Sequence, residues 1–185
     1  KIIGLKACWP IRSDTIEARC NSFSLALALN KALSLDVDII NLSLAGPHDK
    51  VIKLLVDEAV ARGIVTVAAV FAADVGNDVA QSSFPASVPG VIAVASEGTL
   101  SGTSTLGLHE VVTAPGMELI TTIPHSKYNF LSGSSFASAQ VAGYIALLKE
   151  TRPYLTIGEL RDKLIAHSKG VAGRSVPLSV TSTIH

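Results

Sequence analysis

Two hydrophobic patterns alternate along the chain. A continuous apolar run with several β-branched residues at 64–70 is typical of a strand buried on both faces of a parallel sheet. Shorter or interrupted apolar runs, bounded by turn signals, predict further strands at 2–7, 38–44, 91–95 and 110–114. Apolar residues spaced three or four positions apart, or long stretches of Ala and Leu, predict helices at 22–35, 49–62, 135–150 and 156–165. This alternation predicts an α/β domain with helices on both faces of a mostly parallel sheet.

Residues 117–131 follow a different pattern. Two short runs, 120–123 and 128–131, flank the turn-forming segment 124–127 and predict a hairpin or a pair of edge strands. Further on, Thr156 and Glu159 have the spacing of a capping box, which predicts that a last helix begins there.

The composition favours one globular domain. With 185 residues, 48% of them hydrophobic and 16% charged, the chain can bury a core, and we expect residues 1–185 to form a single domain. The 15 basic and 15 acidic residues cancel, so nucleic acid and acidic lipid are not expected partners. No apolar run is long enough to span a membrane. Because the chain begins at Lys1 without a signal-like segment, we expect a mature form or an excised fragment.

The cysteines and histidines indicate no metal site. Cys8 and Cys20 either pair in an oxidising compartment or remain free thiols, and the sequence leaves both alternatives open. The five histidines lack the spacing of metal ligands; they are His48, His109, His125, His167 and His185. We therefore expect neither a metal nor a cofactor.

A Gly/Ser turn at 132–134 leads directly into the predicted helix at 135–150. A serine in the first turn of a helix lies beside unpaired backbone N–H groups and the positive end of the helix dipole, which suits a nucleophile and the oxyanion that forms after its attack. Ser135 is the candidate. The competing interpretation is that Ser134 or Ser135 only caps the helix.

Four segments, in order along the chain, resemble the C-terminal portion of the catalytic domain of the subtilisin-like serine protease family (subtilases). They are a strand and turn at 38–47, the pieces 84–85 and 91–94, an Ala-Pro-Gly turn within 112–116, and a block at 133–137 that is similar to the family's Gly-Thr-Ser-x-Ala and continues at 141–143. The resemblance covers roughly residues 1–167 and outweighs the capping interpretation of Ser135. It implies a three-layer subtilisin-like α/β fold with a mostly parallel sheet that lacks its N-terminal strands.

The resemblance also implies a reaction and a substrate. Ser135 would attack the carbonyl of a peptide bond in a peptide or protein substrate and form an acyl-enzyme. The substrate would lie as an added strand along Ser43, Leu44, Ala45 and Gly46. Ala45 stands where the family usually has glycine. The same resemblance suggests a secreted or periplasmic protein.

The chain departs from the family pattern at three of its functional groups. The family's catalytic Asp and His precede the serine, yet nothing before Ser135 resembles the segments that carry them. We interpret the histidines that precede Ser135 in this sequence as exposed loop residues. The third group is the oxyanion donor, which is an asparagine in the family. Counting residues straight on from the predicted strand at 64–70 places Ala72 at the position of this asparagine, whereas a four-residue insertion would place Asn77 at it. Asp74 is a further candidate, able to donate only when protonated.

Three functions are consistent with these residues. The first is a subtilisin-type serine endopeptidase that acts through Ser135 with Asp and His on a preceding segment, so that this chain alone is inactive. The alternative is a catalytically inactive subtilase-like domain with a binding or assembly role. The third, an α/β-hydrolase, needs Asp and then His well downstream of the serine, where only Asp162, His167 and His185 remain. A sheet without its first strands would expose apolar surface, so we expect self-association or folding with the missing N-terminal segment.

Overall fold

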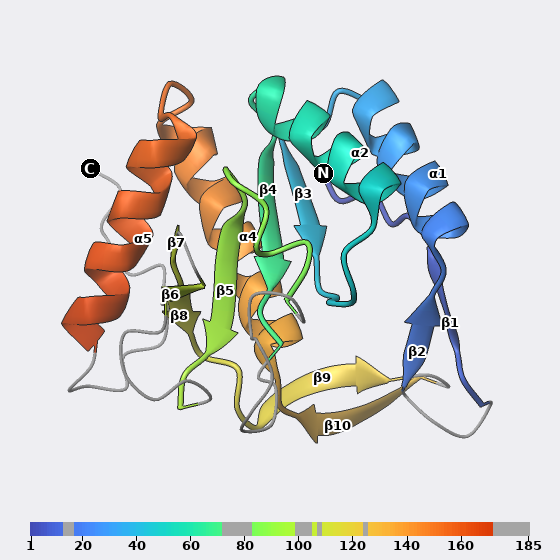
Figure 1. Cartoon of the computed structure of the whole chain (residues 1–185). Coiled ribbons are helices and arrows are strands. Elements are labelled where there is room, and N and C mark those ends of the chain that lie inside the picture. The colour runs from blue at the N-terminus through green and yellow to red at the C-terminus, as the bar shows by residue number, and fades with distance from the viewer. Residues whose placement is uncertain (13–16, 72–82, 99–104, 107–108, 124–125, 172–185) are drawn as a thin grey trace.

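A four-stranded parallel sheet forms the centre of the molecule (Figure 1). The computed structural model describes residues 1–12, 17–71, 83–98, 105–106, 109–123 and 126–171. In spatial order the strands are β3 (Ile39–Leu42), β4 (Val65–Ala69), β5 (Ile92–Ser96) and β8 (Val112–Ala114). Each lies inside or within one residue of a predicted run, which confirms the predicted parallel sheet.

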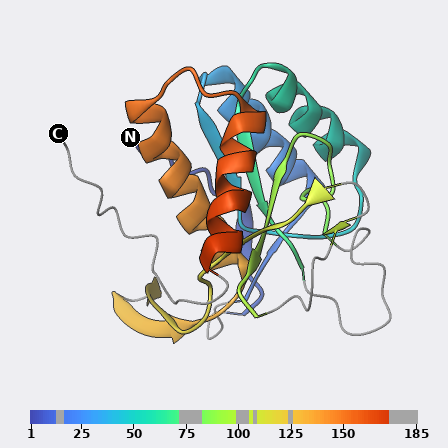
Figure 2. The same ribbon diagram turned by 90° about the vertical axis from the view of Figure 1, so that its left-hand side faces the viewer.

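Helices cover both faces of this sheet (Figure 2). One side carries α1 (Ser22–Ser34) and α2 (Lys50–Ala61), and the other carries α4 (Ser134–Thr151) and α5 (Ile157–Val171). All four helices were expected from the sequence, with bounds that differ by a few residues at most, except that α5 extends further than predicted.

Strand β4 shows why its run is almost entirely apolar. Every residue of β4 is buried. Val65 and Val67 pack in one hydrophobic cluster with Ile145 of α4 and Leu160 of α5. Ala68 belongs to a second cluster with residues of α1 and α2. Because successive side chains of a strand point to opposite faces, a strand between two helical layers buries all of them and is therefore mostly apolar. The exception is Thr66, whose buried hydroxyl donates to the Ile64 carbonyl at 3.5 Å. The three-layer α/β arrangement is thereby confirmed.

Three small antiparallel hairpins complete the described structure. They are β1 (Cys8–Pro10) with β2 (Ala18–Cys20), β6 (Thr105–Leu106) with β7 (His109–Glu110), and β9 (Leu119–Ile123) with β10 (Lys127–Leu131). The β9–β10 pair confirms the hairpin predicted within 117–131. In the first hairpin Cys8 lies opposite Cys20 and the two form a disulfide, which decides between the alternatives that the sequence left open.

The strand predicted at 2–7 is wrong, because the structure has no strand there. Ile2, Ile3 and Leu5 are exposed, and only Ala7 at the end of the run is buried. A strand needs a neighbour to satisfy its backbone N–H and C=O groups, and no strand pairing involves residues 2–7 in the described structure. An apolar run alone therefore did not define a strand.

The predicted capping box at the start of α5 is confirmed. The Thr156 hydroxyl accepts a hydrogen bond from the Glu159 N–H at 3.2 Å, and the Glu159 carboxylate accepts from the Thr156 N–H at 2.8 Å. The Thr156 backbone N–H, and then its hydroxyl, lower the pKa of the Glu159 carboxyl because both donate to its charged form. Among the helices described, none combines the length and apolarity needed to cross a membrane.

Candidate active site

The turn that leads into α4 is fixed by two glycines. The Gly133 N–H donates to the Gly116 carbonyl at 2.7 Å, and Gly133 has a φ of 149°, in a region that favours glycine. A β-carbon on Gly116 would lie only 2.5 Å from the Ser96 hydroxyl oxygen. Ser96 is the last residue of β5, so this packing fixes the start of α4 beyond the carboxyl edge of the sheet. Ligands of open α/β sheets bind at that edge.

Neither serine at the start of α4 caps the helix. The N-cap residue is Gly133, which makes no side-chain capping bond. The Ser134 hydroxyl instead accepts from the Ser96 backbone N–H at 3.2 Å, and the Ser135 hydroxyl donates to the Ser43 carbonyl at 3.1 Å. The capping interpretation is wrong, because both side chains bond to strand ends rather than to N–H groups of α4.

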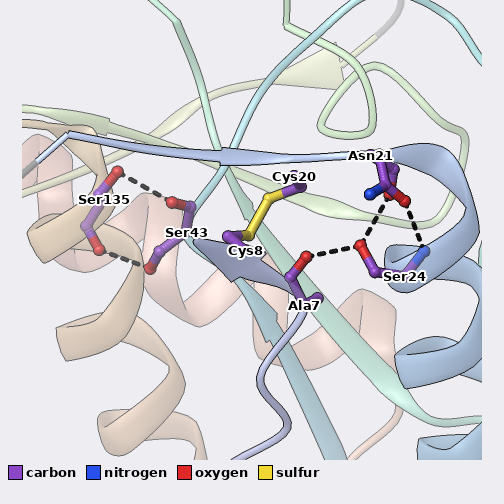
Figure 3. Close-up of a disulfide and its surroundings, with 7 residues drawn as sticks. All are labelled: Ala7, Cys8, Cys20, Asn21, Ser24, Ser43 and Ser135. Atoms are coloured by element: carbon purple, nitrogen blue, oxygen red, sulfur yellow. Dashed lines mark hydrogen bonds between the residues drawn. A yellow bond between two sulfur atoms is a disulfide. The ribbon is translucent and has the colours of Figure 1, made fainter. Parts of the chain in front are cut away.

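Ser43 and Ser135 bond to each other in both directions (Figure 3). While the Ser135 hydroxyl donates to the Ser43 carbonyl, the Ser43 hydroxyl donates to the Ser135 carbonyl at 2.7 Å. Ser43 directly follows β3, and the two residues are 92 positions apart in the sequence. The end of β3 and the first turn of α4 are thus joined at the candidate nucleophile.

This location favours nucleophilic chemistry at Ser135. The residue is partly exposed and lies in the first turn of an 18-residue helix, where backbone N–H groups lack partners within the helix and the helix dipole is positive. Both features stabilise an oxyanion that forms at the serine. The Ser43 carbonyl orients the hydroxyl, but a backbone carbonyl is not a base that removes its proton.

In the part of the chain that the structure describes, no histidine bonds to Ser135. His48 is exposed and packs against the ring of Phe84 at 5.1 Å, and His167 on α5 lies 6.1 Å from the ring of Tyr144. His109 is in β7, and two more histidines lie outside the described residues, namely His125 and His185. Across the described ranges, no group of three or more His, Cys, Asp or Glu residues is placed to hold a metal ion.

The predicted substrate segment forms the continuation of β3. Leu44 packs against the core, whereas Ser43 and Ala45 are exposed. The Gly46 N–H donates to the Phe84 carbonyl at 2.9 Å in an isolated antiparallel bridge, which anchors the end of the segment. The three candidates for the oxyanion position, Ala72, Asp74 and Asn77, lie outside the described residues.

The structure adds three residues to the site that the sequence analysis did not select. Ser138 is fully buried one turn after Ser135, and its hydroxyl lies 3.0 Å from that of Ser43. The Asn41 side-chain amide donates to the Ser43 hydroxyl at 3.0 Å. The Gln140 side-chain amide donates to the Pro115 carbonyl at 3.0 Å. The one available signal was the three-residue spacing of Ser135 and Ser138, which places both on one face of a helix.

Comparisons with known proteins show which proteins this chain resembles in sequence. Subtilisin NAT of Bacillus subtilis subsp. natto is 35% identical over 137 residues, which cover 72% of this chain and 36% of that protein. The major intracellular serine protease of Bacillus subtilis (strain 168) is 32% identical over 164 residues, covering 84% of this chain and 50% of that protein. The chain therefore spans half or less of the length of these relatives.

A solved structure and a family profile complete the comparison. The structure of the prenylagaramide maturation protease PagA matches with a TM-score of 0.65 and 24% identity, over 82% of this chain and 59% of that one, which supports the fold. The profile of the Subtilase family (Peptidase S8) matches residues 10–178, a range that contains both Ser43 and Ser135. Because this match takes in most of the sequence, the chain belongs to the subtilase family.

Proposed function

We propose that Ser135 is the nucleophile of a serine endopeptidase of the subtilisin type. Family membership supports a serine protease of this type. The observation that carries the proposal is the position of Ser135 itself: its hydroxyl is at the N-terminus of α4 and is directed at the end of β3. At a helix N-terminus, backbone N–H groups and the positive end of the helix dipole would stabilise a tetrahedral oxyanion formed at the serine.

The substrate in this proposal is an extended peptide that lies along Ser43, Leu44, Ala45 and Gly46. This segment continues β3, and Ser43 and Ala45 are exposed, so backbone groups are accessible for pairing with an added strand. Its anchorage through Gly46 and Phe84 keeps the segment in place without a ligand. The Ala45 side chain would narrow the space beside the substrate relative to glycine.

The Asp and His of the triad would come from a segment outside this chain, with residues 1–185 forming part of one subtilase domain. Two observations support this division. The chain spans 36% and 50% of two subtilisin-type relatives. In addition, β3 is the end strand of the sheet in the described structure, so its outer edge offers backbone groups to a further strand. For the oxyanion donor we retain Asn77, with Ala72 and Asp74 as the alternatives.

Activity-based labelling of the longest natural chain that contains these residues tests the proposal. A fluorophosphonate probe reacts only with an activated serine, so we expect one modified peptide that contains Ser135 and no labelling in the Ser135→Ala variant. Absence of labelling in well-folded wild-type protein would show that the domain is not a peptidase. The 185-residue chain by itself is expected not to cleave casein, because in this proposal the base with which the serine acts as a unit lies on another segment.

A binding or assembly role is the second candidate, and an exposed apolar face favours it. Ile120 lies opposite Phe130 in the β9–β10 hairpin, with Tyr128 on the same face, and the three side chains are 67%, 66% and 71% exposed. Apolar patches of this kind mark interaction surfaces. Sedimentation of the 185-residue chain is expected to show self-association that weakens in Phe130→Ser, whereas a monomer at all concentrations would count against this role.

A further inference from the structure

We propose that the hydroxyl of Ser43 is a positioning group for Ser135, in addition to the contribution of the Ser43 backbone. It would fix the first turn of α4 so that the Ser135 hydroxyl stays directed at the end of β3. This inference rests on the proposed function, in which Ser135 is the nucleophile.

The two hydrogen bonds between Ser43 and Ser135 hold different parts of the nucleophile in place. The bond from the Ser43 hydroxyl to the Ser135 carbonyl, 2.7 Å long, holds the backbone of Ser135 against the end of β3. The bond from the Ser135 hydroxyl to the Ser43 carbonyl, 3.1 Å long, selects the side-chain orientation. Removing the first bond takes away the contact that ties the Ser135 backbone to the end of β3, and the second bond depends on that placement.

Neighbouring groups determine which hydrogen bonds the Ser43 hydroxyl donates and which it accepts. It has one proton to donate, and it accepts through its lone pairs. The Asn41 amide nitrogen, 3.0 Å away, is only a donor, so Ser43 accepts that bond and its own proton remains available for the Ser135 carbonyl. The Ser138 hydroxyl lies 3.0 Å from both the Ser43 hydroxyl oxygen and the Ser135 carbonyl. The hydroxyls of Ser43 and Ser138 therefore both have hydrogen-bond partners within this cluster.

The same network makes Ser43→Ala an informative variant. Alanine keeps the Ser43 carbonyl, so any pairing of backbone with substrate is retained. The buried Ser138 hydroxyl keeps its bond to the Ser135 carbonyl and is not left unsatisfied. Because Ser43 itself is exposed, its side chain adds nothing to the hydrophobic core. The variant should fold and should differ from wild type mainly in the placement of Ser135.

The test measures the rate at which a small alkyl fluorophosphonate labels Ser135 in the longest natural chain. A displaced nucleophile loses reactivity steeply, so we expect Ser43→Ala to react on the order of tenfold more slowly or worse, with kcat for a peptide substrate reduced and KM little changed. Ser43→Thr keeps the hydroxyl and should recover most of the loss. The matched control is Ser34→Ala, which removes an exposed serine hydroxyl bonded to a backbone carbonyl at the far end of α1 and should leave the rate unchanged.

Two outcomes would overturn the inference. One is labelling of Ser43→Ala at the wild-type rate, and the other is a loss in Ser43→Ala that Ser43→Thr does not recover. If wild-type protein is not labelled at all, the proposed function fails, and crystal structures then decide the positioning role separately. In that case the inference is overturned if the Ser135 hydroxyl in Ser43→Ala remains within hydrogen-bond distance of the residue 43 carbonyl, and supported if it has moved away.

Discussion

Replacing Gly116 with alanine tests the packing that fixes the start of α4. The Gly116 carbonyl accepts the Gly133 N–H at 2.7 Å, so the two residues are in direct contact just before Ser135. A β-carbon at position 116 would lie 2.5 Å from the Ser96 hydroxyl oxygen and 2.9 Å from the Gly133 carbonyl oxygen. Neither neighbour moves easily, because Ser96 is fully buried and the Gly133 atom belongs to the backbone.

The expected loss of stability follows from these distances. Relief of the overlap requires a backbone shift, and overpacking of this kind costs about 1–3 kcal/mol. The lower chain entropy of alanine in the unfolded state offsets about 0.4–1 kcal/mol. At the middle of these ranges the net loss is about 1.3 kcal/mol, so we expect Gly116→Ala to lower the free energy of unfolding by about that amount and the Tm by about 3–5 °C in a domain of this size.

Urea unfolding of the 185-residue chain measures this change, and Gly143→Ala is its control. Gly143 lies inside α4 and a β-carbon there would meet nothing within 4 Å, so the same substitution should raise stability by about 0.5–1 kcal/mol. The m-value should be the same in all three proteins. The reasoning is refuted if Gly116→Ala is as stable as wild type, or if both variants lose stability equally.

Three further predictions concern the core, the last helix and the disulfide. Ile145→Ala should cost about 2–5 kcal/mol in urea unfolding because the side chain is fully buried, whereas the exposed Leu147→Ala on the same helix should cost under about 1 kcal/mol. Because folding lowers the pKa of Glu159, its stabilisation is complete above the ordinary value of 4.5 and is lost as the pH falls below it. The difference in urea midpoint between wild type and Glu159→Gln should therefore shrink toward zero between neutral pH and pH values well below 4.5; a constant difference would contradict this. Replacing Cys8 and Cys20 with serine opens a disulfide with a sequence separation of 12 and should lower stability by about 2–4 kcal/mol in thermal unfolding, relative to wild type under non-reducing conditions.

The central strands were predictable because their environment imposes a simple rule. A strand covered on both faces has no solvent-facing side, so a nearly continuous apolar run identifies β4 and β5, in which only Thr66 and Ser96 are polar. The same rule failed at residues 2–7, where the run is apolar but the described structure offers no pairing strand. An apolar composition indicates that a segment prefers to be buried. A strand also requires a neighbouring strand for its backbone hydrogen bonds, and a local sequence pattern does not show whether that neighbour exists.

The site was predictable only in part, for a similar reason. The resemblance placed Ser43 and Ser135 in one site, and the structure brings them into direct contact. Their reciprocal hydrogen bonds depend on how one strand end meets one helix start, 92 residues later, which no local pattern encodes. The capping alternative was wrong for a related reason. A serine near a helix start often bonds to backbone N–H groups of its own helix, but here both hydroxyls bond to backbone groups of distant strand ends instead.

The Ser135–Ser43 contact also constrains how a base from another segment would act. The Ser135 hydroxyl has one proton, and in this structure it is donated to the Ser43 carbonyl. A histidine that activates Ser135 must take over that proton, so the O–H bond has to turn from the Ser43 carbonyl toward the base. A neutral hydrogen bond contributes only about 1 kcal/mol net, so the exchange is not costly. The Ser43 carbonyl can therefore orient the Ser135 hydroxyl without preventing transfer of the hydroxyl proton to a base. The bond from the Ser43 hydroxyl to the Ser135 carbonyl uses a different proton, so it remains in place during this transfer.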